Sequence, residues 1–589
     1  MKKISLLVLD KYKQDSLLDL RRLGLVHIKY IAPPASPDID SILEQIEGID
    51  KALQIIFRYP LPHREEKSID EQDALSLAAQ IISWDKERAN CRREREEIKR
   101  KISWYKDWGK LSPNSLKELA AEGVYIRLYK CSRKELRLLR KRSIVEVIKA
   151  EGHNYYIAVV SFGAKENIAL PEILPPDEEL ELLNKKLKAT EEKISSLENL
   201  LTEQTVLKKV LLNSSEQLQK SLDFNKVKSG MQQEGEISCL QGFMPAGEIT
   251  RLVNLAKSKG WAYLIQDPDN LEEVPTLIKN PAWLRIIEPV FKFMGTLPGY
   301  NEQDISLVFL LFFSLFFALL IGDAGYGLLF FIATYFIRKK LPDIRPEAFM
   351  LMYVLSFATV IWGAVSGTWF GVAGIARLPF FKTMVISRVN SFMDINQGFM
   401  MYICFLIGAV HLTLAHASAA LKMLNSLKAL AQAGWILIIW GLFFVADSLV
   451  LGKELFRHTA TMFFSGITLT LFFSHPQKNF LKGIGITLTD LPLRIMSSFS
   501  DIVSYLRLFA VGYATVAVAA SFNNLALRFG FNDILGGFIA ALILFLGHGL
   551  NILLGLMAVI VHGIRLNMLE FSSHLGMQWS GIEYKPFKE

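Results

Sequence analysis

Long apolar segments occupy only the second half of this chain, and their position decides what it can fold into. Residues 1–304 carry dense charge, whereas runs such as Leu307–Leu320, Ile403–Val410 and Ile539–Leu546 belong to longer apolar stretches. A helix that crosses the hydrocarbon core of a bilayer, about 30 Å thick, needs about 20 such residues. Residues 305–574 supply that length several times over, so the sequence predicts a membrane domain over 305–589 and a soluble domain over 1–304.

Eight apolar stretches are candidate membrane spans. They cover 305–321, 325–337, 347–370, 399–421, 430–451, 459–474, 491–528 and 533–574. The first two share the turn Gly322-Asp323-Ala324-Gly325-Tyr326-Gly327, and a single helix of about 33 residues is the alternative. Basic residues favour the cytoplasmic side, and Arg338–Lys340 reaches the side of the N-terminal half only if the chain crosses twice before it.

Continuing the count places two further basic segments and the C-terminus in the cytoplasm. These basic residues are Lys422, Lys428, Lys478, Lys482, Lys585 and Lys588. The loop that contains Arg377, Lys382 and Arg388 falls outside and counts against this topology. We expect an integral multi-pass membrane protein whose N-terminal domain and C-terminus are cytoplasmic.

The first half alternates short strand patterns with long charged helices. Residue patterns over 3–9, 12–23 and 26–30 predict a β-α-β start. Helical spacing over 38–57, 73–108 and 177–224 predicts long helices, with strand-like segments between the last two. The expected fold is an α+β dumbbell, two α/β lobes joined by an antiparallel helical coiled-coil hairpin, followed by an all-α membrane domain of about eight helices. The proximal lobe is 1–37 and 235–304, the arms are 38–110 and 177–230, and the distal lobe is 111–176.

The long charged hairpin has two interpretations. A helix of about 45 residues spans roughly 65 Å, which favours an interaction arm that holds something at a distance; a merely structural hairpin is the alternative. The sequence of this half has no phosphate-binding glycine-rich loop, Ser/His/Asp set or Cys/His cluster, which disfavours an enzyme active site.

Charge and cysteine usage exclude other classes. The net charge of +8 is typical of the cytoplasmic loops of a membrane protein, so nucleic-acid binding is not expected. The four cysteines, Cys91, Cys131, Cys239 and Cys404, are widely separated. Their spacing predicts neither a metal site nor a disulfide framework and fits a reducing compartment.

The last two spans are each about 40 residues long, roughly twice what a bilayer core requires, so each must tilt, protrude or break. On the seventh, a polar face is formed by Ser497, Ser500, Ser504 and Arg507. Arg507 lies near mid-span, where a charge in lipid costs about 3 to more than 10 kcal/mol. Such a charge marks an ion pathway; the alternatives are snorkelling or a structural ion pair, for example with Asp501.

The eighth span carries a second polar stripe. At 3.6 residues per turn, one sector of about 100° holds His548, Asn551, Gly555, His562 and Arg565. The individual members are weaker indicators, because Arg565 near the span's end could snorkel and a lone histidine is more often a packing residue.

Several motifs, taken in order, resemble one known family. They are Gly322-Asp323-Ala324-Gly325-Tyr326-Gly327, Ser504-Tyr505-Leu506-Arg507-Leu508, Gly547-His548-Gly549-Leu550-Asn551 and His562-Gly563-Ile564-Arg565-Leu566-Asn567-Met568-Leu569-Glu570-Phe571, with Pro298-Gly299-Tyr300-Asn301-Glu302 and Tyr584-Lys585-Pro586-Phe587. Their order and spacing resemble the membrane subunit I, subunit a in eukaryotic enzymes, of V-type and A-type rotary ATPases. The resemblance covers the chain from about residue 235 onward.

The resemblance implies roles for the polar residues of the last two spans. Arg507 and Arg565 would face a rotating membrane ring of c/K subunits, each with an ion-binding carboxylate, and two offset half-channels would lead to the ring. The serine face would border this path. An acidic residue of eukaryotic relatives is replaced by Gly555, so the exit path would rely on His548, Asn551, His562 and Glu570.

The resemblance also implies partners and a division of labour. The N-terminal lobes would bind peripheral stalk heterodimers of E/G type, and the central-stalk adaptor subunit is a further candidate partner. ATP chemistry would lie on other subunits, with H⁺ or Na⁺ as the transported ion and no other cofactor. Asp323, Gly322, Gly325 and Gly327 would be structural motif residues. A prokaryotic cell membrane is the expected location.

Two other functions compete with this interpretation. A secondary transporter with a cytoplasmic regulatory domain would have inverted repeats with paired broken helices, and the sequence has no such internal symmetry. A membrane-anchored coiled-coil scaffold would have no reason to bury Arg507. The sequence leaves open the choice between H⁺ and Na⁺ and the direction, synthesis or pumping.

Overall fold

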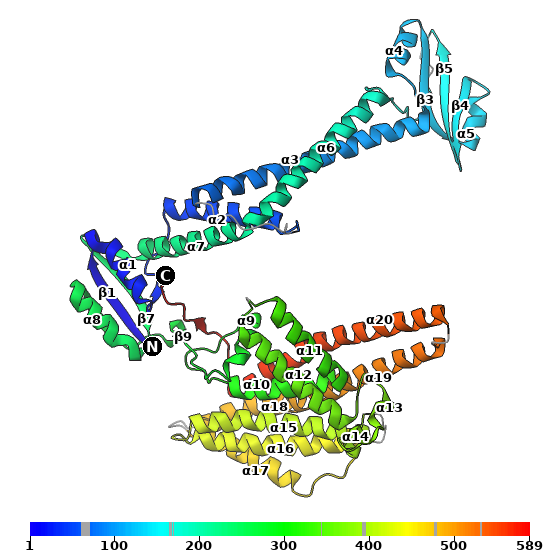
Figure 1. The fold of residues 1–589 in the computed structure, drawn as a ribbon. Coiled ribbons are helices and arrows are strands. Elements are labelled where there is room, and N and C mark those ends of the chain that lie inside the picture. Colours follow the sequence, from blue (N-terminus) through cyan, green and yellow to red (C-terminus); the bar gives the residue numbers. More distant parts are fainter. Residues whose placement is uncertain are drawn as a thin grey trace. The chain divides into compact units, whose positions relative to one another are not determined.

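The computed structural model describes residues 1–60, 71–163, 168, 170–342, 344–391, 396–475, 480–530 and 533–588. They form two compact units, coloured along the chain in Figure 1. The α/β unit consists of Lys3–Ile265 and Pro586–Glu589, and the helical unit of Met1–Lys2 and Gln266–Lys585. Lys478, which the sequence places in a cytoplasmic loop, lies outside the described residues.

A five-stranded sheet forms the first lobe of the α/β unit. Its strands lie in the order β2 (His27–Lys29), β7 (Ile237–Met244), β1 (Lys2–Leu9), β8 (Ala262–Gln266), and β6 (Gln232–Glu234) pairs with β7. Helix α1 (Lys13–Leu23) connects β1 to β2, and α8 (Ile249–Lys259) connects β7 to β8. This is a split β-α-β arrangement, and it confirms the predicted β-α-β start.

The core of this lobe includes the last residues of the chain. Ile4, Leu6 and Val8 alternate along β1 and are buried, as expected where one face of a strand meets a core. Phe587 is buried in the same cluster. Its N–H donates to the Val26 carbonyl at 2.8 Å, so the C-terminal segment belongs to the α/β unit.

Two helix pairs lie between this lobe and a second sheet. Helix α2 (Pro37–Ile56) packs on α7 (Lys208–Gly230), and α3 (Glu71–Trp108) packs on α6 (Leu180–Glu203). Ion pairs join α3 to α6 on their exposed sides. They are Arg92–Glu198 at 2.6 Å, Glu87–Lys193 at 2.7 Å and Lys99–Glu191 at 3.5 Å. Exposed pairs of this kind contribute about 0–1 kcal/mol each, so the buried apolar contacts of Ile98 and Tyr105 with Leu183 supply most of the association of α3 with α6.

The second lobe is a three-stranded antiparallel sheet. Strand β5 (Asn154–Phe162) lies between β3 (Val124–Ser132) and β4 (Ile144–Glu151). The short helices α4 (Pro113–Ala121) and α5 (Arg133–Leu139) flank β3, and Ser132 and Glu135 form a capping box at the start of α5. Trp108, the last residue of α3, packs edge-on against Tyr156 of β5 with 5.2 Å between ring centroids. This contact attaches the sheet to the end of the long helix.

The helical unit is built from apolar helices. They are α9 (Glu288–Met294), α10 (Ser306–Ile321), α11 (Ala324–Lys340), α12 (Pro346–Ser366), α15 (Gln397–Lys422), α16 (Lys428–Leu451), α17 (Thr459–Phe473), α18 (Phe480–Ser504), α19 (Leu506–Phe529) and α20 (Ile534–Ala558). After α20 the chain continues through the π-helical segments η8 (Val559–Gly563) and η9 (Leu566–Phe571) into α21 (Ser572–Leu575).

Five helices among the described residues are long and apolar enough to cross a membrane. They are Pro346–Ser366, Gln397–Lys422, Lys428–Leu451, Leu481–Phe529 and Ile534–Leu575. The pair α10 and α11 is bent by 119° and adds a sixth if it counts as one broken span. The last two have 49 and 42 residues, so both are overlong, as predicted. The one-helix alternative for 305–337 is wrong, because α10 ends at Gly322.

The segment before α10 packs with the helices. Ile287 and Phe291 belong to the helical unit's main apolar cluster, and the Phe291 ring meets Phe309 edge-on at 4.9 Å. Strand β9 (Pro275–Thr276) pairs in parallel with β10 (Ile582–Glu583). The two compact units therefore divide at Gln266, whereas charge density and the start of the apolar runs predict a boundary at 304/305.

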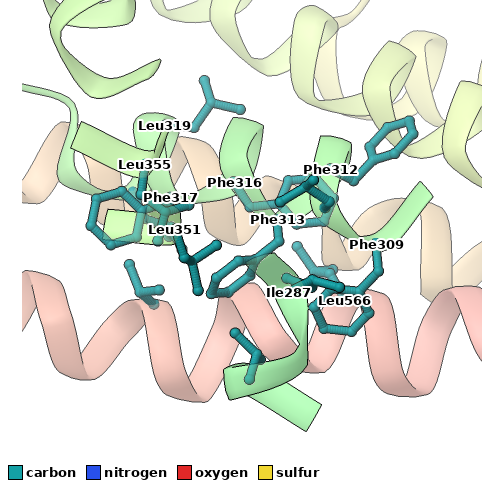
Figure 2. Close-up of a cluster of buried hydrophobic side chains, with 14 of the residues drawn as sticks. Ile287, Phe309, Phe312, Phe313, Phe316, Phe317, Leu319, Leu351, Leu355 and Leu566 are labelled. Carbon is teal, nitrogen blue, oxygen red and sulfur yellow. The ribbon is translucent and has the colours of Figure 1, made fainter. Parts of the chain in front are cut away.

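Helix α10 occupies the centre of the helical unit's core. Figure 2 shows its phenylalanines packed against side chains of α12, of the segment before α10 and of η9. The labelled α10 residues are Phe309, Phe312, Phe313, Phe316, Phe317 and Leu319. Leu351, Leu355, Ile287 and Leu566 meet them from the other elements. Because α10 is covered almost all round, it is a fixed support for the helices that pack on it.

Asp323 holds the break between α10 and α11. Its Oδ1 accepts hydrogen bonds from the N–H groups of Gly325 (2.8 Å), Tyr326 (3.3 Å) and Phe370 (2.8 Å), and its Oδ2 accepts from Gly371 (2.9 Å). The side chain is buried. One carboxylate thus caps α11 and fixes the loop after α12, which gives the Gly-Asp motif a structural role.

The glycines around Asp323 allow this close packing. Gly322 has φ +66° at the end of α10, a conformation that favours glycine. A Cβ on Gly325 would lie 2.5 Å from the Phe370 ring, and one on Gly327 would lie 2.8 Å from the Val360 nitrogen of α12.

Candidate functional site

Helices α18 and α19 form one long helix that is interrupted only at Tyr505. The Tyr505 side chain is fully buried, and its hydroxyl lies 2.8 Å from His411 Nδ1 of α15. The His411 ring is stacked between Phe312 and Phe571, at centroid distances of 3.9 and 4.4 Å. This aromatic clamp fixes the backbone two residues before Arg507.

Two arginines converge on a single carboxylate beside this clamp. Arg507 Nη2 donates to Glu570 Oε1 at 2.8 Å, and its Nε donates to the Ser504 carbonyl at 3.0 Å. Arg565 Nε lies 3.6 Å from the same Glu570 oxygen. The Glu570 side chain is 4% exposed, that of Arg507 26% and that of Arg565 54%.

The charges of this cluster do not balance. Two guanidinium groups, which stay protonated at any physiological pH, face one carboxylate, so the three side chains carry a net charge of about +1 with Glu570 ionised. Glu570 Oε2 is buried and has no hydrogen-bond partner among the described residues. The cluster is able to bind one further negative charge on its open side.

Arg507 does form an ion pair within its own chain, which is one of the alternatives that the sequence leaves open, but its partner is Glu570 and the suggested Asp501 is wrong. Asp501 Oδ2 lies 3.1 Å from His574 Nε2. Arg507 has its carboxylate partner in its own chain, because η9 brings Glu570 across to the start of α19. The sequence named Glu570 for the exit path only, and not as this partner.

The π-helical segments explain the pairing. A π turn closes hydrogen bonds five residues apart, so from η8 onward the residues leave the register of a 3.6-residue helix. The predicted stripe is divided accordingly: Asn551 is buried with other partners, and His562 Nδ1 is buried without a hydrogen-bond partner in the described part of the chain.

A second polar group surrounds Tyr326 of α11. Its hydroxyl lies 2.7 Å from His548 Nδ1 and accepts a hydrogen bond from Asn551 Nδ2 at 3.0 Å. His548 Nε2 lies 3.1 Å from Asn523 Oδ1 of α19, and Asn551 also donates to the Thr515 carbonyl at 2.8 Å. Helices α11, α19 and α20 are thus joined by a polar chain within an apolar surround.

A third polar group lines a cavity of about 360 Å³ at the end of α15 and the start of α16. His416 Nε2 lies 2.9 Å from His574 Nδ1, and His416 Nδ1 lies 2.6 Å from Gln432 Oε1. With the contact between His574 and Asp501, four side chains from α15, α16, α18 and α21 form one chain of hydrogen bonds.

The predicted serine face is divided among different surroundings. Ser504 Oγ lies 3.4 Å from Glu570 Oε1 and donates to the Asp501 carbonyl at 2.7 Å. Ser497 lines the 360 Å³ cavity, and Ser500 is exposed.

Several residues of these groups were not singled out from the sequence. They are Tyr326, His411, His416, Asn523 and His574. Two signals were available: ionisable residues such as His411 and His416 inside an apolar span are functional candidates by default, and His574 follows Glu570 by one helical turn. Among the described residues, no group of three or more His, Cys, Asp or Glu side chains is placed to hold a metal ion.

Comparison with known proteins places this geometry in context. No protein-family model matches the chain. V-type ATP synthase subunit I of Borreliella burgdorferi is 32% identical over 623 residues, covering 100% of this chain and 99% of that protein. V-type ATP synthase subunit I 1 of Treponema pallidum is 28% identical over 638 residues, covering 100% and 99%. A-type ATP synthase subunit I of Methanocaldococcus jannaschii is 27% identical over 386 residues, covering 59% and 54%.

A solved structure is also similar to part of the chain. It is described as the crystal structure of the cytoplasmic N-terminal domain of subunit I, homolog of subunit a, of V-ATPase, and it has a TM-score of 0.26 and 16% identity over 45% of this chain and 100% of that one.

Proposed function

The chain belongs to the family of V-type and A-type ATP synthase subunit I, and from this membership we propose that it is the ion-translocating stator subunit of a rotary ATPase. Its helical unit carries H⁺ or Na⁺ across the membrane together with a ring of rotor subunits. Its α/β unit anchors the peripheral stalks, and ATP is made or hydrolysed on other subunits.

The unbalanced cluster of Arg507, Arg565 and Glu570 carries this proposal. A net positive charge within apolar spans is costly unless a counter-charge approaches it. The open side of the cluster is the side of Arg565, whose side chain is 54% exposed. A carboxylate of the rotor ring is a counter-charge of the required sign and size.

The cluster has a chemical consequence for the bound ion. A guanidinium group near a ring carboxylate stabilises its ionised form, so the carboxylate releases the H⁺ or Na⁺ that it carried. After release the two charges attract one another, and the ring moves on only when the carboxylate binds an ion again from the other side. The fixed guanidinium also blocks a direct leak between the two half-channels.

The surface around Arg565 supports a ring contact on the same helix. In an apolar 18-residue stretch of Ile534–Leu575, only 22% is buried within the chain, against 39% for the equivalent stretch of Pro346–Ser366 and 44% for that of Lys428–Leu451. Large exposed side chains follow this helix, including Phe545, Leu553 and Ile560. Apolar helices of a ring fit such a surface.

The two other polar groups are the proposed linings of the half-channels. The chain of Tyr326, His548 and Asn551 borders one route, and the cavity with His416 and His574 borders the other. Along the last helix His548 precedes Arg565, and His574 follows Glu570, so the two groups lie on opposite sides of the charged cluster. Charge bias at Lys422 and Lys428 assigns the second group to the cytoplasmic side.

The remaining parts complete the assembly that we propose. All eight predicted spans lie in the bilayer, with α10 and α11 as two arms of a broken crossing and α18 with α19 as one overlong span. The α/β unit is cytoplasmic, and its two lobes with the paired helices between them, the dumbbell, bind E/G-type stalk heterodimers, with the central-stalk adaptor as a further partner.

The test is ATP-driven ion uptake by the assembled enzyme in liposomes. Arg507→Ala abolishes uptake, and so does Arg507→Lys, because a compact ammonium does not reproduce the delocalised fork that meets a carboxylate. Arg528→Lys, at the exposed end of the same helix, keeps uptake and serves as the matched control. Near-normal uptake by Arg507→Ala, in an enzyme that still contains all its subunits, overturns the proposed mechanism.

A further inference from the structure

The 360 Å³ cavity is polar and large enough for several water molecules. Its charged and titratable lining residues are His416 of α15, Arg494 and Asp501 of α18, and His574 of α21. A neighbouring cavity of about 350 Å³ shares Ala419, Met423, Leu575 and Gly576 with it and is bordered by Glu302 and Lys422. The two cavities are therefore neighbours, and the first brings room for water directly to the two histidines.

The hydrogen bonds that run from Gln432 through the two histidines to Asp501 allow two arrangements in which every donor has an acceptor. In the first, the Gln432 oxygen accepts from His416 Nδ1–H, His416 Nε2–H donates to His574 Nδ1, and His574 Nε2–H donates to Asp501. His416 then has protons on both nitrogens and is a cation, while His574 is neutral.

In the second arrangement the Gln432 amide is turned by 180°. Its NH₂ group donates to His416 Nδ1, the two remaining hydrogen bonds are unchanged, and both imidazoles are neutral. The two arrangements differ by one proton, and neither loses a hydrogen bond. This chain of hydrogen bonds is thus able to take up and release one proton without leaving a buried polar group unpaired.

The added proton is also able to move along the chain. When it passes from His416 Nε2 to His574 Nδ1, over 2.9 Å, His416 becomes neutral and keeps Nδ1–H toward Gln432. His574 becomes the cation, directly beside the Asp501 carboxylate that stabilises it. One N–H bond breaks and one forms, so the transfer is balanced without another reactant.

The chain of hydrogen bonds from Gln432 to Asp501 ends next to the charged cluster. Ser504 connects the two, because its hydroxyl donates to the Asp501 carbonyl and lies 3.4 Å from Glu570 Oε1. Ser573, which lines the cavity, donates to the Glu570 carbonyl at 3.0 Å. A proton on His574 is therefore one helical turn from Glu570, whose Oε2 is buried without a partner in the described residues.

We propose that His416, His574 and Asp501 form a proton relay between the cytoplasmic cavity and the charged cluster, so that the transported ion is H⁺. This inference rests on the proposed function and names its ion. The relay does not suit Na⁺, which prefers several oxygen ligands, because Asp501 is the cavity's one carboxylate among its described lining residues and is already paired with His574.

The experiment uses the assembled enzyme in liposomes, with ATP-driven acidification of the interior as the readout. His416→Ala and His574→Ala lower the initial rate by about 10²-fold or more, the lower end of the usual contribution of a positioned acid-base group. His458→Ala, a histidine in an exposed turn, leaves the rate unchanged. Subunit composition after purification confirms that each variant enzyme is assembled.

Chemical rescue separates a relay from a structural role. Imidazole in the medium fits the cavity enlarged by His416→Ala and restores the rate of ATP hydrolysis coupled to proton flow severalfold, because it replaces the missing proton carrier. Hydrolysis is the readout for this step, since imidazole is a permeant weak base and would itself neutralise the vesicle interior. A subunit that had merely lost packing would not respond. Acidification also persists in buffer free of Na⁺. Loss of acidification without Na⁺, unchanged rates in both histidine variants, or a loss that imidazole does not restore would each overturn the relay.

Failure of the relay and failure of the proposed function give different results. If Arg507→Ala stops transport while both histidine variants pump normally, the stator function stands and the relay is wrong. If Arg507→Ala pumps normally, the proposed function itself is wrong.

Discussion

Arg507 Nη2 and Glu570 Oε1 lie 2.8 Å apart although 63 residues separate them in the chain. The contact joins the start of α19 to the second π-helical segment after α20. Arg565 approaches the same oxygen from one turn away, so Glu570 holds the two guanidinium groups together.

Loss of the Glu570 charge is expected to destabilise the helical unit. Glu570→Gln keeps the shape of the side chain but leaves two like charges facing each other, and removal of one partner from a buried ion pair costs about 3–5 kcal/mol. Thermal unfolding of the purified chain in detergent measures the effect as a lower melting temperature. Glu583→Gln, in an exposed pair with Lys585, is the control, and equal melting temperatures for both variants would contradict the expectation.

Asp323 is expected to be irreplaceable by alanine. Asp323→Ala orphans four backbone N–H groups, and each buried unpaired donor costs about 1–3 kcal/mol. Asp323→Asn keeps one acceptor oxygen and has a smaller effect. In thermal unfolding in detergent, the melting temperature is expected to be highest for the wild type, lower for Asp323→Asn and lowest for Asp323→Ala. A variant Asp323→Ala that melts with the wild type would show that the break between α10 and α11 needs no carboxylate.

Alanine substitutions at two glycines are expected to distinguish the cost of overpacking from the gain in helix propensity. Gly327→Ala forces a methyl group against the α12 backbone at 2.8 Å, and overpacking of this kind costs about 1–3 kcal/mol. Gly549→Ala has no neighbouring atom within 4 Å and gains up to about 1 kcal/mol of helix propensity. Stability measured by heat unfolding is therefore expected to fall for the first variant and not for the second. The reverse order would exclude the close approach of α11 to α12.

The thiol of Cys131 is expected to react slowly until high pH. Burial, followed by the charge of Glu135, raises the pKa of Cys131 above its usual value, and only the thiolate is alkylated. A raised pKa keeps the proton on sulfur to higher pH, so the alkylation rate reaches half its maximum above pH ~8.5, the midpoint for a free thiol. Mass spectrometry after brief iodoacetamide treatment measures this. In urea the burial is lost and the midpoint of the rate profile returns to the usual pKa; the same midpoint in the folded protein would disprove the burial.

The periodic parts of the fold were predictable because burial imposes its period on the residue pattern. The strands over 3–9 and 237–243, the helix over 73–108 and the apolar helices appear in the structure at those positions. The break at Gly322 was predicted as one of two alternatives, because the two short stretches share a turn motif and because Arg338–Lys340 reaches the cytoplasmic side only after two crossings.

The site was predictable only in part because it depends on contacts between distant segments. Arg507 is visible in the sequence, since a charge inside an apolar span is rare. Its pairing with Glu570 depends on two π turns, which change the register that an ideal helical wheel assumes. The hydrogen bond between His416 and His574 joins residues 158 positions apart, and no local pattern encodes such a pair.

The π-helical segments change how many residues the last helix holds per turn. A π turn accommodates more residues in one turn than an α turn does, so the stretch from Val559 to Phe571 contains more residues than an α-helix with the same number of turns. A deletion of one residue there would let one π turn tighten into regular α form, so the residues beyond it would keep their faces, whereas the same deletion in a regular α-helix rotates everything beyond it by about 100°. Ser573 and His574 would then keep their neighbours although the helix held one residue fewer. This stretch is therefore expected to tolerate a change of one residue in length better than a regular helix does.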